Sequence, residues 1–256
     1  MPNHLQRSLK HEYEIYVQEE IEYYKDSVPR STLLSIGDEA VGVLAEELQL
    51  PLTELLLCEE VDRIIRRRLR IPAYATWHRR RGKLVEKYRR PEHWNLSPDD
   101  AFVRVMHPTT EGHVLVASAA REGPALYLAA NGCEVTAVDE QPEMVRRVLS
   151  AAGAAGLAVR GYVINLGEWS PDVSLRAVVC GDAAFAGLAA RERKRVIQIL
   201  QSATLDGGVH LVETLVAGDN AMSIDELRSS YRGWHVSIDR GGSGSPSTFI
   251  ARKTDS

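Results

Sequence analysis

The segment from His113 to Asp139 constrains the fold of this chain more than any other feature. Two short apolar runs, 113–117 and 134–138, flank a run of small residues and a helical pattern over about 122–130. The second apolar run ends at the carboxylate of Asp139. This order of strand, turn, helix and strand is typical of the opening of a nucleotide-type α/β domain.

The rest of the chain separates into two parts. Residues 1 to about 107 show no good strand signal, whereas later residues alternate strand and helix patterns at the spacing of βαβ units. We expect a helical N-terminal region over 1–107 and an α/β domain over 108–256. We expect its further helices at 142–154, 189–203 and 223–231. We expect its further strands at 158–164, 175–180, 209–215, 234–238 and 248–252.

Asp139 is the first candidate binding residue. Open parallel sheets bind ligands at the carboxyl ends of their strands, and Asp139 stands at such an end. Its carboxylate there can accept hydrogen bonds from both hydroxyls of a ribose. Glu140, Gln141 and Pro142 follow, so the alternative is that Asp139 caps the next helix.

The segment 112–149 resembles the first two motifs of class I S-adenosylmethionine-dependent methyltransferases of the tellurite-resistance and thiopurine type. The matching residues are Tyr127, Leu128, Ala129, Gly132, Val135, Thr136, Ala137, Val138 and Asp139. The resemblance covers about 112–253. It implies a mostly parallel Rossmann-like sheet with a C-terminal antiparallel hairpin, S-adenosylmethionine as cofactor, and methyl transfer to an acceptor that the sequence does not identify.

The first loop departs from the pattern of that family. Val116 stands where the family usually has an acidic residue. Ser118, Ala120 and Glu122 stand at glycine positions, and Gly123 is the glycine that remains nearby. Glycine suits such loops because it adopts positive φ and lets backbone amides approach a ligand. We therefore expect either a turn rerouted through Gly123 or an altered pocket.

The resemblance implies a cofactor site made of Ala117, Ser118, Ala119, Gly123, Asp139, Glu140, Asn165 and Leu166. In it, the turn from Ser118 to Gly123 follows the methionine part, Asp139 holds the ribose hydroxyls, and Asn165 lies near the adenine amino group. For Asn165 the alternative is a bond to its own loop backbone. Trp169 either walls the adenine or covers the core.

Two other interpretations remain open. Ser118, Ala120 and Gly123 have the G-x-G-x-x-G spacing of a nicotinamide dinucleotide domain, but two of the three glycines are absent. The hairpin expected at the C-terminus favours the methyltransferase fold instead. Because the loop is degenerate, the alternative function is a non-catalytic protein that keeps this fold for binding or assembly.

No conspicuous catalytic residue is present. Methyl transfer is an in-line displacement from a sulfonium, and its catalysis can rest on proximity and orientation. Asp182, after the strand expected at 175–180, is the candidate for orienting an acceptor or removing a proton, with helix capping as the alternative. Glu213, near the end of the strand expected at 209–215, and His210, within it, are lesser candidates. The alternative for His210 is a structural role, as is usual for a lone histidine in an apolar strand.

Composition and charge suggest a cytoplasmic protein with no membrane partner. The chain has 44% hydrophobic and 26% charged residues and a formal net charge of −4. No apolar run approaches the roughly 20 residues that span a bilayer. The N-terminus lacks the apolar core of a signal peptide. Cys58, Cys133 and Cys180 form no metal or disulfide pattern and are expected in the core.

Helices in the N-terminal region are expected to begin at Ser35 to Asp38, at Thr53 to Glu54 and at about Ala73. In the second of these we expect a broad apolar face made of Leu55, Leu56, Cys58, Val61, Ile64, Ile65 and Leu69. The chain is acidic overall, but its segment 63–90 contains twelve Lys or Arg residues and one acid.

Such an excess of positive charge can bind the phosphates of nucleic acid, with the break near Ile71 as the turn of a helix-turn-helix. The candidate contacts are Arg66, Arg67, Arg79, Arg80 and Arg81. The alternatives are a solvated helix face or a face docked on acids near the N-terminus. A homo-oligomer is left open.

Overall fold

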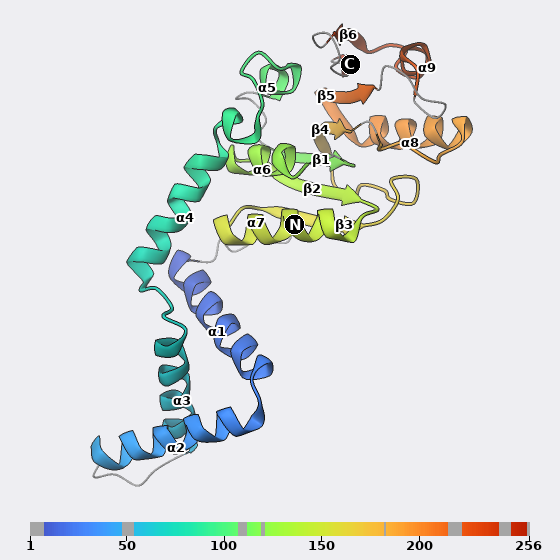
Figure 1. The fold of residues 1–256 in the computed structure, drawn as a ribbon. Coiled ribbons are helices and arrows are strands. Elements are labelled where there is room, and N and C mark those ends of the chain that lie inside the picture. The colour runs from blue at the N-terminus through green and yellow to red at the C-terminus, as the bar shows by residue number, and fades with distance from the viewer. Residues whose placement is uncertain are drawn as a thin grey trace. The chain divides into compact units, whose positions relative to one another are not determined.

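The computed structural model describes residues 8–47, 54–106, 112–118, 121–181, 183–214, 222–240 and 247–254 (Figure 1). The chain forms two compact units, residues 1–80 and 81–256, and the boundary falls within helix α4 (Tyr74–Tyr88). Residues 81–106, which the sequence grouped with the N-terminal region, thus belong to the second unit. The boundary predicted at 107/108 lies outside the described residues.

The first unit is helical in its described part. It contains α1 (Leu9–Ser27), α2 (Arg30–Glu47), α3 (Glu54–Arg68) and the start of α4. Its core is small: Ile21, Ile36, Ala40, Ile64 and Ile65.

One expectation for this unit is wrong, and another is confirmed only in part. Helix α2 begins at Arg30 rather than near Ser35, because the carbonyl of Pro29 already accepts hydrogen bonds from the amides that follow it. On α3, Leu55 and Cys58 are exposed, whereas Glu60 is buried and pairs with Arg63 at 2.7 Å. The expected face is confirmed only in part, because Val61, Ile64, Ile65 and Leu69 pack in this core whereas its edge at Leu55 and Cys58 does not.

The second unit is built on a seven-stranded sheet with the order β3-β2-β1-β4-β5-β7-β6. Its strands are β1 (His113–Ala117), β2 (Glu134–Asp139), β3 (Val159–Val163), β4 (Leu175–Cys180), β5 (Thr204–Thr214), β6 (His235–Asp239) and β7 (Ser247–Arg252). Strands β1 to β5 are parallel, and β7 runs antiparallel to both β5 and β6. The predicted mostly parallel sheet with a C-terminal antiparallel hairpin is confirmed.

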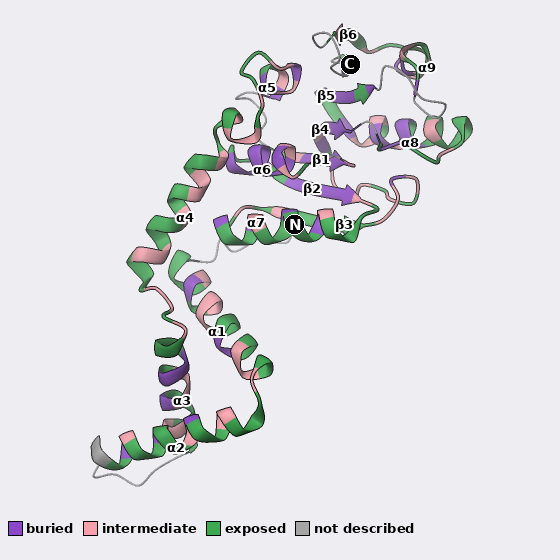
Figure 2. Cartoon of the chain, viewed as in Figure 1, coloured by how far each residue is buried: buried purple, intermediate pink, exposed green. Residues whose placement is uncertain are grey.

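Helices cover both faces of this sheet. They are η1 (Pro91–Trp94), α5 (Ala101–Met106), α6 (Gly123–Ala130), α7 (Pro142–Ala155), α8 (Ala190–Ala203) and α9 (Ile224–Ser230). Side chains alternate along a strand, so Val114 and Val116 join a core with α6 and α7, while Leu115 and Ala117 join a core with α8 and α9. Figure 2 shows the inner strands buried between these layers. No helix in the described residues has the length and apolar character needed to cross a membrane.

Two arginines of the basic segment 63–90 donate hydrogen bonds to the C-terminal ends of helices in this unit. Arg81 donates through Nε to the carbonyl of Ala155 at 3.1 Å and through Nη2 to that of Gly156 at 3.0 Å. Arg89 donates through Nε to the carbonyl of Ala130 at 2.8 Å. These carbonyls lie at the C-terminal ends of α7 and α6, where the helix dipole favours positive charge. Part of the basic segment is therefore structural.

Candidate functional site

The strand order reverses between β1 and β4, which is where open α/β sheets bind ligands. Backbone bonds fix the strand ends around this point. The amide of Gly181, after β4, donates to the carbonyl of Ala117 at 2.9 Å, and the amide of Ser118 donates to the carbonyl of Val138 at 2.8 Å. The ends of β1, β2 and β4 are thus held as one edge.

The turn after β1 has an unusual backbone conformation. Ser118 adopts φ +46°, a left-handed conformation that costs a non-glycine residue about 1–2 kcal/mol. Gly123 is the first residue of α6 and does not have a positive φ. A Cβ at Gly123 would lie 3.1 Å from Cβ of Trp94. Glycine at this position allows η1 to pack against the start of α6.

Asp139 has the capping role that was its alternative, and its place at the end of β2 is as expected. Its Oδ1 accepts a hydrogen bond from the amide of Gln141 at 2.8 Å, which is the capping alternative. Its other carboxylate oxygen has no hydrogen bond to any described residue, and the side chain is half-exposed at the end of β2. Capping therefore leaves one oxygen available to a ligand.

Asn165 has the local role that was its alternative. Its Oδ1 accepts from the amide of Gly167 at 2.7 Å, and its Nδ2 donates to Oε1 of Glu140. The contact brings together two of the residues implied in the cofactor site. Leu166 is buried in the core, and Trp169 packs against the same core rather than standing apart from it. Ala119, Ala120 and Asp182 lie outside the described residues.

A cleft of about 1080 Å³ opens beside this edge. Its floor includes Gly181 after β4, Glu213 of β5 and Thr248 of β7. Its walls come from the start of α6 and from residues 87–102. The sequence placed the latter in another region, and no motif marks them as part of a site.

The wall formed by 87–102 is aromatic and fixed. His93 stacks on Tyr88 with the two ring planes 7° apart, and its ring centroid lies 4.5 Å from that of Trp94. The Nε1 of Trp94 donates to the carbonyl of Tyr88 at 3.0 Å. Burial, assisted by the charge of Lys87, lowers the pKa of His93.

Charges in the cleft are partly compensated. Burial opposes the ionisation of Glu122, but a backbone hydrogen bond and the guanidinium of Arg147, 2.7 Å away, outweigh it and lower the pKa of that carboxyl. Asp239 pairs with Arg104 of α5. Arg121 has no polar partner among the described residues.

His210 lies outside the cleft and is structural. It is completely buried, with Nε2 2.7 Å from Oγ1 of Thr204 and Nδ1 2.7 Å from the hydroxyl of Tyr231. Burial, with a smaller contribution from Lys253, lowers the pKa of His210 to about 3. Of the two lesser candidates, the structure therefore brings only Glu213 to the cleft.

The basic residues predicted to contact nucleic acid have mixed environments. Arg66 donates to the hydroxyl of Tyr13 and lies 5.7 Å from the centre of its ring. Arg81 is bound to the end of α7. Arg67 and Arg79 are exposed and lack a polar partner within the described residues. Nucleic-acid contact stays a prediction, and Arg81 is unsuitable for testing it.

Among the comparisons with known proteins, only that with solved structures found similar proteins. No protein-family model and no curated protein sequence matches the chain. TehB from Haemophilus influenzae is similar in structure, with 16% identity and a TM-score of 0.53 over 64% of this chain and 65% of TehB. It is of the tellurite-resistance type that the sequence resembles. The likeness shows a class I methyltransferase fold.

Two further solved structures have lower TM-scores. The N-methyltransferase NodS from Bradyrhizobium japonicum WM9 has 13% identity and a TM-score of 0.48, over 62% of this chain and 100% of NodS. Magnesium protoporphyrin IX methyltransferase from Synechocystis PCC 6803, with bound SAM, has 17% identity and a TM-score of 0.44, over 55% of this chain and 69% of that one.

Proposed function

We propose that this protein is an S-adenosylmethionine-dependent methyltransferase. The cofactor would lie along the carboxyl ends of β1, β2 and β3, and the acceptor in the adjoining cleft. The observation that carries the proposal is the left-handed turn at Ser118, which stands at the strand-order reversal. Glycine-rich loops adopt this conformation to bring backbone amides close to a ligand.

The residues at this edge fit an adenosyl cofactor. Asp139 has a carboxylate oxygen without a partner in the described residues, which suits a ribose hydroxyl. Glu140, after β2, and Asn165, after β3, are joined to each other and would place a carboxylate and an amide near the adenine. When bound, S-adenosylmethionine supplies an electrophilic methyl group on its sulfonium. The chain supplies binding and orientation.

The cleft suits an acceptor because it combines a rigid aromatic wall with a few polar groups. Tyr88, His93 and Trp94 would exclude water from one side of the acceptor. Glu213, at the end of β5, would hold the nucleophile or accept its proton. Asp182 is retained as a second candidate for this role. Orientation by these groups is sufficient for an in-line transfer.

Calorimetric titration tests the cofactor assignment. The wild type should bind S-adenosylmethionine and S-adenosylhomocysteine, and Asp139→Ala should weaken both by about tenfold or more, since a hydrogen bond to a charged group is lost. Asp172→Ala is the matched control. It removes an exposed carboxylate that precedes β4, at the opposite edge of the sheet, where Asp172 pairs with Arg160 at 3.5 Å.

An absence of heat at millimolar ligand would reject the cofactor assignment. The same fold would then serve binding or assembly without catalysis. Equal weakening in Asp139→Ala and Asp172→Ala would also count against the site, because it would indicate a general electrostatic effect rather than a contact.

A further inference from the structure

A second cleft, of about 560 Å³, lies between α9 and β6. Three arginines line it: Arg228 from α9, Arg232 from the turn that follows, and Arg240 after β6. No acidic residue lines it within the described part of the chain. Arg232 and Arg240 are exposed and have no polar partner among the described residues.

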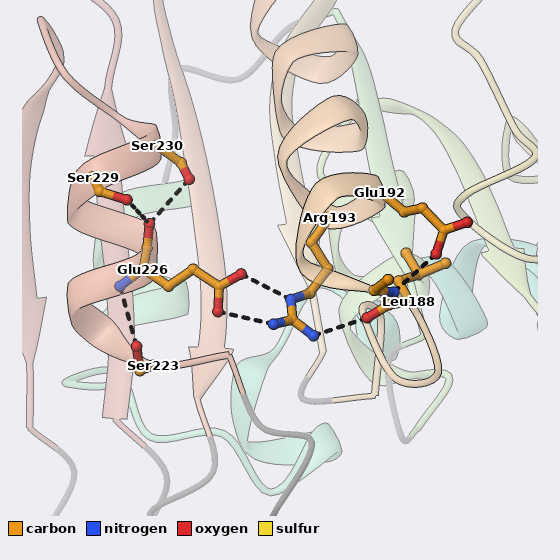
Figure 3. A network of polar contacts seen from close by, with 8 residues as sticks. Leu188, Glu192, Arg193, Ser223, Glu226, Ser229 and Ser230 are labelled. Carbon is orange, nitrogen blue, oxygen red and sulfur yellow. Dashed lines mark hydrogen bonds and ion pairs between the residues drawn. The ribbon is translucent and has the colours of Figure 1, made fainter.

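The acids nearest to these arginines in sequence are bound elsewhere or point into solvent. Figure 3 shows Glu226 turned toward α8, where both of its oxygens accept from Arg193, at 2.9 and 3.0 Å. Asp239 pairs with Arg104. Asp225 lies 4.0 Å from Arg228, and its side chain is 94% exposed, so it neutralises little of that charge.

The base of the cleft is rigid. Tyr231 is 2% exposed, and its hydroxyl is held by His210 at 2.7 Å. Trp234 packs edge-on against Tyr231 with ring centroids 5.4 Å apart. Gly233, at φ +88°, makes the turn that carries the chain from Arg232 into β6. The backbone that carries Arg232 is therefore fixed by buried neighbours.

We propose that the α9–β6 cleft binds the phosphate group of a small-molecule ligand. Guanidinium groups match phosphate oxygens in a two-point geometry, and several of them in a cleft without an acidic lining residue favour a multiply charged anion. The volume is that of a small-ligand site rather than of an extended polymer groove. The assignment does not rest on the proposed methyl transfer, although Arg240 also lines the first cleft.

Titration of the intact protein with inorganic pyrophosphate, at constant ionic strength and without cofactor, tests this site. The double variant Arg228→Ala/Arg232→Ala should weaken binding by about tenfold or more, because charge-assisted hydrogen bonds are lost. The matched control is Arg191→Ala/Arg195→Ala, which removes the same charge from the exposed face of α8. It should leave the affinity within about twofold. Thermal unfolding confirms that both variants fold.

Three outcomes would overturn the proposal. The first is an absence of saturable binding at millimolar pyrophosphate. The second is an equal loss of pyrophosphate affinity in the two double variants. The third is binding of a single-stranded oligonucleotide without binding of pyrophosphate. The first would leave the arginines as solvated surface. The second would indicate diffuse charge, and the third would indicate a nucleic-acid surface instead of a small-ligand site.

Discussion

Polar side chains in the two halves of the sheet, the β2–β3 half and the β5 half, differ in their burial and in their hydrogen-bond partners. At the carboxyl ends of β2 and β3, Asp139 and Asn165 lie near the surface and accept hydrogen bonds from amides two residues away. In β5, Thr204 and His210 are buried and are satisfied partly by Tyr231, which is distant in sequence. Lys253 adds a bond from Nζ to the carbonyl of Thr204 at 2.6 Å.

This difference separates side chains that are available to a ligand from side chains that stabilise the fold. A surface group with a local partner can exchange or share that partner when a ligand arrives. A buried group cannot lose its partner without a desolvation penalty. We therefore expect substitutions in the β2–β3 ends to change binding, and substitutions in the β5 network to change stability.

The largest effect is expected for His210→Phe. This change leaves the buried hydroxyl of Tyr231 without its partner and should lower the free energy of unfolding by about 2–4 kcal/mol. Asp139→Asn should lower it by less than about 0.5 kcal/mol, as for most surface substitutions. Urea denaturation measures the free energy of unfolding of both variants. Similar losses in the two variants would contradict the difference expected between the β2–β3 ends and the β5 network.

Gly156→Ala tests a close contact between the end of α7 and Arg81. Gly156 has φ +63°, and a Cβ there would lie 1.6 Å from Nη2 of Arg81. The left-handed strain and the displaced arginine together should cost about 2–3 kcal/mol.

Gly153→Ala is the control for this change. Nothing lies within 4 Å of a Cβ at Gly153, inside α7. Alanine there should stabilise the protein by about 0.5–1 kcal/mol through helix propensity. Equal destabilisation by both alanines would exclude the Arg81 contact as the cause.

A pH dependence should come from His210. Its pKa is about 3 in the folded protein against 6.5 as the ordinary value, so the unfolded chain binds the proton more readily. Stability should therefore fall as the pH drops from 6.5 toward 3, by up to about 1.4 kcal/mol per pH unit, or about 2 kcal/mol between pH 6.5 and 5. His210→Phe should lack this component, and an unchanged pH profile in that variant would assign the dependence to other groups.

A smaller effect than those of His210→Phe and Gly156→Ala is expected at Ser118. Ser118→Gly relieves the left-handed strain and should make the protein about 1 kcal/mol more stable than Ser118→Ala, which keeps the Cβ. Thermal unfolding of the two variants measures the difference. A more stable alanine variant would show that the turn is not strained at this residue.

Local patterns predicted most of the α/β unit. The apolar runs at 113–117 and 175–180 coincide with β1 and β4, because buried parallel strands are apolar along their length. The family resemblance supplied the sheet type and the antiparallel hairpin. The strand positions follow from a few neighbouring residues, and the sheet type follows from the resemblance to the family.

Features that depend on distant contacts were not predictable in the same way. Residues 81–106 join the α/β unit because Arg81 and Arg89 bind the ends of helices far along the chain. The aromatic wall of the cleft was missed for this reason. The start of α2 at Arg30 depends on bonds to a proline carbonyl, which apolar spacing does not reveal.

Hydrogen exchange with and without S-adenosylhomocysteine tests the central claim most directly, because it locates the bound cofactor on the sheet. We predict slower exchange in peptides covering 118–124 and 139–142, and no change in peptides covering 228–240. Protection confined to 228–240, or no protection at saturating ligand, would contradict the assignment of the cofactor to the ends of β1, β2 and β3.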